Sequence, residues 1–278
     1  MSIIALTTDF GLKDHYVGAL KGKIFSEFLE AKLVDISHDV DPFNISQASY
    51  IIGAAYASFP KKTVHIIAVD MELNLENSHV AIEWNNQFFI AADNGILSIL
   101  TQKIKPQSIF EINIHDRFPT NPTDVDVFVR VACHIAKGGT LNVIGKEIES
   151  LKQITELRTT ISDDGKTLKG FVNYIDNYGN AVTNISKKIF EEIQKGRSFE
   201  INFKNKNIKT IFARYSDIGL SGNYPLTKYA SSMLAVFNEA GFLEIAIFRS
   251  NPNGVGSANS LLGLNYRDVI SVVFKSEI

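Results

Sequence analysis

Short apolar runs alternate with longer stretches of helical periodicity through the first half of the chain. Residues 3–6, 33–36 and 64–69 are rich in Ile and Val, which is typical of strands buried on both faces of a parallel sheet. Between them, residues 15–29 and 45–59 repeat apolar positions every three or four residues, which predicts amphipathic helices. This βαβαβ order predicts an α/β domain with a mainly parallel central sheet.

The same domain is expected to continue to about residue 150. The pattern predicts strands at 80–83 and 88–91, a helix that opens near Asn94, and a helix at 126–136 that Gly138 helps to end. Periodicity then fades, and the stretch closes on the turn signal Ser162-Asp163-Asp164-Gly165. We therefore place an N-terminal α/β domain at 1–150 and a linker at 151–166.

The pattern of the remaining residues, 167–278, is that of short strands. A brief helix near Ile189 interrupts them. Spacing of this kind is typical of an antiparallel sandwich or barrel. The predicted strands are 168–175, 199–203, 208–212, 233–237, 242–248 and 269–274.

Composition narrows the class of ligand. The 278 residues are 45% hydrophobic and 21% charged, with a net charge of -2 and a pI near 6.3, so there is no basic field that would favour nucleic acid, and a small molecule is expected instead. The single cysteine, Cys133, excludes an internal disulfide and indicates a reducing compartment. With no leader-like start and no apolar run of about 20 residues, we expect a mature, soluble cytoplasmic protein.

Two carboxylates follow predicted buried strands. Asp9 comes after the first strand and Asp70 after the third, where open α/β sheets bind ligands. Side by side they would repel unless a cation, a proton or a hydroxylated ligand separated them, which suggests a ribose or a metal. Each could equally cap the turn that follows it.

Other polar positions are open to a plainer interpretation. Asp93 with Asn94 is expected to cap a helix, and His134 to pack on one. The run 176–180 (Asp-Asn-Tyr-Gly-Asn) after a predicted strand is either a β-turn or a site for a zwitterionic ligand. The histidines lack zinc-site spacing, and no Rossmann, P-loop or nucleophile-elbow motif is present, so the residues alone name no reaction.

Several blocks of sequence, taken together, resemble one known family. The opening block is Thr8-Asp9-Phe10-Gly11-Leu12-Lys13-Asp14-His15-Tyr16-Val17-Gly18. The others follow in family order over nearly the whole chain: Lys21-Gly22, 35–38, Val69-Asp70, 92–95, 174–180 and 241–246. They are similar to the motifs of the S-adenosylmethionine hydroxide adenosyltransferases, whose relatives include fluorinase and chlorinase.

The resemblance implies a fold, an assembly and a set of binding residues. The expected fold is an N-terminal α/β domain and a C-terminal β-barrel, in a homotrimer that binds S-adenosylmethionine between domains of adjacent subunits. By motif match, the substrate-binding residues are Asp9 for the ribose hydroxyls, Phe43 beside the ribose, Asp14 and Asp176 at the methionine end, and Asn180 and Tyr215 for adenine. A carboxylate suits two hydroxyl groups and an aromatic face suits a purine.

The reaction that the resemblance implies is attack of water or hydroxide on the ribose 5′ carbon, which gives adenosine and L-methionine. No metal or cofactor is expected, because the sulfonium is already a good leaving group. Of the family's Asp-Arg-His triad, Asp70 matches the aspartate, but Asn77 stands where arginine is expected and the block 118–126 lacks the histidine. Nearby His115 and Arg130 could compensate. The alternative is a catalytically weak protein that binds S-adenosylmethionine or adenosine.

Overall fold

The chain folds into two compact units, residues Met1–Thr155 and Glu156–Ile278. The structure is a computed structural model that describes residues 3–102, 104–220, 222 and 224–275. Each unit has its own apolar core and is described by itself. Among the described residues, no helix is both long and apolar enough to cross a membrane.

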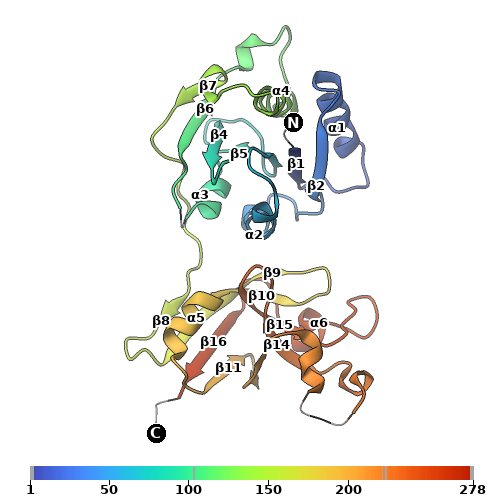
Figure 1. Cartoon of the computed structure of the whole chain (residues 1–278), viewed down its shortest axis with the longest axis vertical. Coiled ribbons are helices and arrows are strands. Elements are labelled where there is room, and N and C mark those ends of the chain that lie inside the picture. Colours follow the sequence, from blue (N-terminus) through green and yellow to red (C-terminus); the bar gives the residue numbers. More distant parts are fainter. Residues whose placement is uncertain (1–2, 103, 221, 223, 276–278) are drawn as a thin grey trace. The chain divides into compact units, whose positions relative to one another are not determined.

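The N-terminal unit is a seven-stranded sheet with helices on both faces (Figure 1). The strand order is β2-β1-β3-β5-β4-β6-β7. Its strands are β1 (Ile3–Thr8), β2 (Lys32–Ser37), β3 (Val64–Ala68), β4 (His79–Trp84), β5 (Gln87–Ala92), β6 (Ser108–Ile112) and β7 (Gly145–Glu147). Its α-helices are α1 (Tyr16–Glu27), α2 (Ile45–Ala55), α3 (Ile96–Leu100) and α4 (Asp124–Ala136).

Alternation along the buried strands explains the two layers of helices. Ile66 of β3 lies in the core with α1 and α4, whereas the next residue, Ile67, lies in the core with α2 and α3. Successive side chains of a strand point to opposite faces, so a run that is apolar at every position serves both cores.

The expectation of a mainly parallel sheet was wrong for half of this unit. The pairs β1–β2, β1–β3 and β3–β5 are parallel, whereas β4–β5, β4–β6 and β6–β7 are antiparallel, so the sheet is mixed. Only Asn85 and Asn86 separate β4 from β5, both with positive φ. A two-residue loop of this kind forces a hairpin, and Asn tolerates the left-handed conformation that it requires.

The C-terminal unit is a nine-stranded, nearly closed, barrel-like sheet. The order is β12-β11-β16-β9-β10-β15-β14-β13, with β8 paired to β9, and β12 contacts β14 near the other end of the order. The strands are β8 (Thr160–Ile161), β9 (Thr167–Ile175), β10 (Ala181–Ser186), β11 (Phe199–Phe203), β12 (Lys206–Ile208), β13 (Ile211–Phe212), β14 (Met233–Phe237), β15 (Phe242–Ile247) and β16 (Val269–Phe274). The α-helices are α5 (Lys187–Gln194) and α6 (Ala258–Leu262).

Three details of this sheet differ from the sequence prediction. The strand expected at 208–212 is split, because β12 pairs with β11 whereas β13 pairs with β14. The β13–β14 pair is parallel, so the sheet is not purely antiparallel. The sequence prediction also omitted β10, which pairs with β9 and β15 and follows the turn at 176–180.

Candidate functional site

The Asp9 carboxylate lies at the carboxyl end of β1 and joins three segments of the N-terminal unit. Its Oδ2 accepts hydrogen bonds from the backbone N–H of Phe43 at 3.0 Å and of Asp70 at 3.3 Å. Strands β2 and β3, which lead to these two residues, both pair with β1, so the topology brings the loops together. The two acidic residues singled out from the sequence are therefore neighbours, through the backbone of Asp70 and the carboxylate of Asp9.

The backbone at both donor residues is unusual. Phe43 has φ of 63° and Asp70 has φ of 45°, in the left-handed region that residues other than glycine seldom occupy. Asn94, which is buried, holds the second position by donating from Nδ2 to the carbonyls of Val69 at 3.2 Å and Asp70 at 2.9 Å. The residue expected only to cap a helix thus also fixes the backbone of the candidate catalytic aspartate.

The Phe43 and Asp14 side chains face solvent in the described chain. The Phe43 ring is 73% exposed and Asp14 is exposed. Neither side chain contributes to the core of its own unit, which leaves both free to contact a ligand.

The loop that follows Asp70 is held at both of its ends. The buried His79 lies under its start, with Nε2 3.0 Å from the carbonyl oxygen of Met71. Burial, the largest cause, lowers the pKa of His79, so the ring is neutral and Nε2–H donates. At the far end, the Lys152 ammonium donates to Oδ1 of Asn77 at 2.8 Å. The lysine side chain thus contacts the residue that stands where the family arginine is expected.

The two residues considered as replacements for the triad have different surroundings. His115 lies beside this loop, with Nε2 3.2 Å from Nδ1 of His79. Arg130 of α4 instead has its Nε 3.4 Å from Oε2 of Glu27, at the end of α1. Its guanidinium lies over the ring of Phe118. Of the two, His115 therefore lies nearer to the loop that follows Asp70 and is the better candidate to replace a triad residue.

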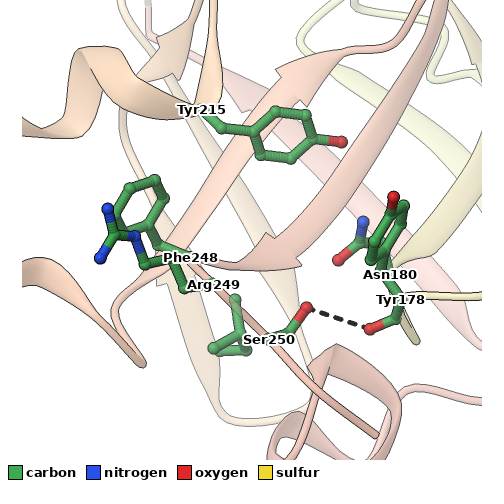
Figure 2. A pocket seen from close by; sticks show the side chains of 7 residues that line it. Tyr178, Asn180, Tyr215, Phe248, Arg249 and Ser250 are labelled. Carbon is green, nitrogen blue, oxygen red and sulfur yellow. Dashed lines mark hydrogen bonds between the residues drawn. The ribbon is translucent and has the colours of Figure 1, made fainter. Parts of the chain in front are cut away.

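Two of the other predicted binding residues, Asn180 and Tyr215, line a pocket of the C-terminal unit (Figure 2). The third, Asp176, is not among the lining residues. The volume of the pocket is about 360 Å³. Figure 2 shows Tyr215 on one side and Asn180 with Tyr178 on the other. The lining residues are Tyr178, Asn180, Tyr215, Ile247, Phe248, Arg249 and Ser250.

The turn between β9 and β10 presents an amide to this pocket. Asp176 Oδ1 accepts from the backbone N–H of Tyr178 and of Asn180, each at 2.8 Å, and Oδ2 accepts from Nδ2 of Asn180 at 3.0 Å. Because Nδ2 must face the carboxylate, Oδ1 of Asn180 is left to the pocket. This oxygen is buried and accepts no hydrogen bond within the described chain. An unsatisfied acceptor in a pocket suits a ligand amino group.

Glu244 of β15, which lies behind the pocket, was not among the predicted site residues. It is only 3% exposed, and its carboxylate accepts a hydrogen bond from the Tyr215 hydroxyl. Burial, the largest cause, raises the pKa of Glu244, as it also raises that of Asp176. A charged residue within an apolar strand was the available signal.

No metal site is evident in these surroundings. The described residues contain no group of three or more His, Cys, Asp or Glu side chains that could hold a metal ion. The Asp9 Oδ2 already accepts hydrogen bonds from two backbone amides.

Both units match domain models of the same protein family. The model of the S-adenosylmethionine hydroxide adenosyltransferase N-terminal domain matches residues 4–145, and that of the C-terminal domain matches residues 170–271. Both stretches lie within the compact units of the structure.

Individual relatives support the match over the full length. A Methanocaldococcus jannaschii protein named (R)-S-adenosyl-L-methionine hydrolase is 28% identical, covering 99% of this chain and 97% of its own. A fluorinase from Actinopolyspora mzabensis is 24% identical over 70% of this chain and 75% of its own. Among solved structures, an uncharacterized conserved protein from Thermotoga maritima has a TM-score of 0.82 at 26% identity, covering 98% of this chain and all of its own.

Proposed function

The chain belongs to the S-adenosylmethionine hydroxide adenosyltransferase family, and we propose that it is an S-adenosylmethionine hydrolase that forms adenosine and L-methionine. One observation carries the proposal. The carboxylate expected to bind the ribose, Asp9, accepts a hydrogen bond from the backbone N–H of the candidate catalytic residue, Asp70. A ribose held by Asp9 would place its 5′ carbon close to Asp70.

The proposed binding mode assigns each group of the ligand to a motif residue. Asp9 accepts hydrogen bonds from the ribose hydroxyls while the exposed ring of Phe43 covers the sugar. Asn180 Oδ1 accepts from the adenine amino group, and the Tyr215 ring packs on the purine face. Asp14 and Asp176 face the methionine end, where a carboxylate suits the α-ammonium group, in an assignment that the family motif supports.

The reaction is a single displacement. A water oxygen forms a bond to the ribose 5′ carbon as the carbon–sulfur bond breaks, and methionine leaves as a neutral thioether. Asp70 orients the water and accepts the proton that it loses. The protein contributes alignment and exclusion of bulk water, since the sulfonium needs no further activation.

The replaced triad residues favour a second candidate function. Asn77 supplies no cation to keep Asp70 ionised and orient water, and the block 118–126 supplies no histidine. The Lys152 ammonium on Asn77 and the ring of His115 are the described groups that could take these roles. If they do not, the protein binds S-adenosylmethionine or adenosine with little turnover.

One experiment decides between the two functions. Purified protein is incubated with S-adenosylmethionine and the products are separated by chromatography, with heat-killed protein and Asp70→Asn as controls. Adenosine that forms only with the active wild type supports the hydrolase. Tight binding by calorimetry without adenosine above the heat-killed control would favour the binding protein.

We further propose a homotrimer with its ligand site between domains of adjacent subunits, working in the cytoplasm. Family membership supports the assembly, and exposed Leu12, Tyr16 and Leu75 in the N-terminal unit offer apolar surface for it. The single buried thiol of Cys133 suits a reducing compartment. Sedimentation equilibrium measures the assembly, and a monomer at working concentration would overturn it.

A further inference from the structure

Glu244 is a buried acid in an apolar part of the C-terminal sheet. Its strand, β15, lies between β10 and β14, and the residues directly opposite it are Val182 and Val236. At 3% exposure it cannot be solvated by bulk water, so its charge depends on hydrogen bonds from the protein. Such a residue is costly to keep in a core, and it needs a reason beyond packing.

Each carboxylate oxygen of Glu244 has a donor of its own. The Tyr215 hydroxyl donates to Oε1, and Nδ2 of Asn238 donates to Oε2 at 3.1 Å. Two donors facing two oxygens match the ionised, acceptor-only form of the side chain. Tyr215 begins a 3₁₀ helix, Tyr215–Gly219, and its ring is 41% exposed as a wall of the pocket. Glu244 therefore connects the core to the pocket wall.

Protonation would disturb this arrangement. A proton on Oε2 would face the Asn238 amide, and a proton on Oε1 would oblige the Tyr215 hydroxyl to turn its hydrogen away. Burial, followed by the charge of Asp176, raises the pKa of Glu244 above its ordinary value, against the lowering effect of its hydrogen-bond donors. The groups that act on Glu244 come from the neighbouring elements: Tyr215 from the 3₁₀ helix, Asn238 after β14, and Asp176 and Asn180 from the β9–β10 turn.

We propose that Glu244 is a positioning residue for the pocket: its ionised carboxylate fixes the Tyr215 ring on which the adenine of the ligand packs, and acidification weakens binding by releasing that ring. The inference rests on the proposed function for the identity of the ligand. It adds a residue that touches no ligand and acts through another side chain.

The test is the pH dependence of adenosine binding, measured by calorimetry between pH 8 and pH 5. We expect the wild-type dissociation constant to rise as Glu244 becomes protonated, by up to about tenfold, the order that loss of one hydrogen bond to a charged group produces. Glu244→Gln, which cannot ionise, should bind several-fold more weakly than wild type at pH 8 and should show little change with pH. Circular dichroism at both ends of the range checks that each protein stays folded.

Two tyrosine variants make the test independent of whether Glu244→Gln folds. Tyr215→Phe keeps the ring and removes the hydroxyl, so it should abolish most of the pH dependence. Tyr178→Phe is the matched control, because Tyr178 lines the same pocket and the hydroxyl that donates to Glu244 is that of Tyr215. Whatever its affinity at pH 8, this variant should keep the pH dependence of the wild type.

Two outcomes would overturn the inference, and they can be told apart. A wild-type pH profile that persists in Glu244→Gln and Tyr215→Phe would assign the effect to another group, such as Asp176, and leave the proposed function intact. Failure of the wild type to bind either adenosine or S-adenosylmethionine at any pH would overturn the proposed function, and the role of Glu244 with it.

Discussion

Asp9 in the N-terminal unit and Asp176 in the C-terminal unit are both strand-end carboxylates, but their hydrogen-bond donors come from different parts of the chain. Asp9 accepts from the backbone of Phe43 and Asp70, which are far away in sequence. Within the described residues, the Asp176 carboxylate accepts from its own turn, including the side chain of Asn180. The first arrangement depends on strands that are far apart in the sequence, whereas the second lies within the single hairpin of β9 and β10.

This difference indicates different roles for the two carboxylates. Both donors to Asp9, Phe43 and Asp70, have backbone φ angles in the left-handed region. This conformation costs free energy in residues other than glycine, so the surrounding structure must stabilise it. The donors of Asp176 shape a turn and orient Asn180. We infer that Asp9 and Asp70 bind and act on the ligand, while Asp176 serves first to present the Asn180 amide.

The sharpest test of this contrast is catalytic and concerns Asp70. Asp70→Asn keeps the size of the side chain and loses the base, so kcat should fall by roughly 10²- to 10⁴-fold, the usual contribution of a positioned general base. The Kd for S-adenosylmethionine should change little. Adenosine release followed by chromatography gives the rate, and unchanged kcat would remove Asp70 from the mechanism.

The next effect concerns binding by Asp9. Asp9→Ala should lose roughly 2 to 4 kcal/mol of S-adenosylmethionine binding, since each hydrogen bond to a charged group contributes about 1.5 to 3 kcal/mol and such losses rarely add fully. The dissociation constant would weaken roughly thirtyfold to thousandfold. Calorimetry on wild type and variant, with equal circular dichroism confirmed, measures it.

Asp9→Asn is the matched control, because it keeps one oxygen to accept from the amides of Phe43 and Asp70. We expect it to preserve thermal stability while still weakening binding. Equal affinities of wild type and Asp9→Ala would show that the site lies elsewhere.

Acidification should affect the stability of the two units differently. Burial, the largest cause, lowers the pKa of His65 from 6.5 to about 4, so the folded state binds fewer protons than the unfolded chain. The contribution of His65 to the free energy of unfolding is present above pH 6.5 and is lost as the pH falls to about 4. The loss is about 3 kcal/mol, at about 1.36 kcal/mol per pKa unit. The raised pKa values of Asp176 and Glu244 have the opposite sign, so their contribution grows as the pH falls.

The N-terminal unit should therefore unfold first in mild acid. Trp84, the single tryptophan, packs on Phe89, which stacks on His65, so its fluorescence follows this unit. His65→Gln, which can still bond to Gln87 and cannot be protonated, should shift the transition to lower pH. An unchanged acid midpoint in this variant would contradict the assignment to His65.

The smallest expected effect is on the pocket wall. Tyr215→Ala removes the ring and should weaken adenosine binding by about 1 to 3 kcal/mol, the usual contribution of a base stacked on an aromatic side chain. Binding of free methionine should be unaffected. If Tyr215→Ala weakened methionine binding as much as adenosine binding, the pocket would not be specific for the base.

Much of the fold could be predicted because its signals are local. Apolar runs gave β1 and β3 within a residue or two, and helical periodicity gave α1. The mixed sheet was missed because the direction of β4 depends on two asparagines, and the strand at 208–212 because its two ends pair with different partners. Local pattern does not contain the identity of a partner strand.

The sequence by itself determined the family, the secondary-structure class of each domain and the candidate site residues. It could do so because motifs and hydrophobic periodicity are local features of the sequence. Tertiary structure alone decided which of those residues meet. It placed Asp70 against Asp9, it put Lys152 on Asn77, and it hid Glu244 behind Tyr215. Each of these contacts joins segments far apart in the chain, which only the folded structure brings together.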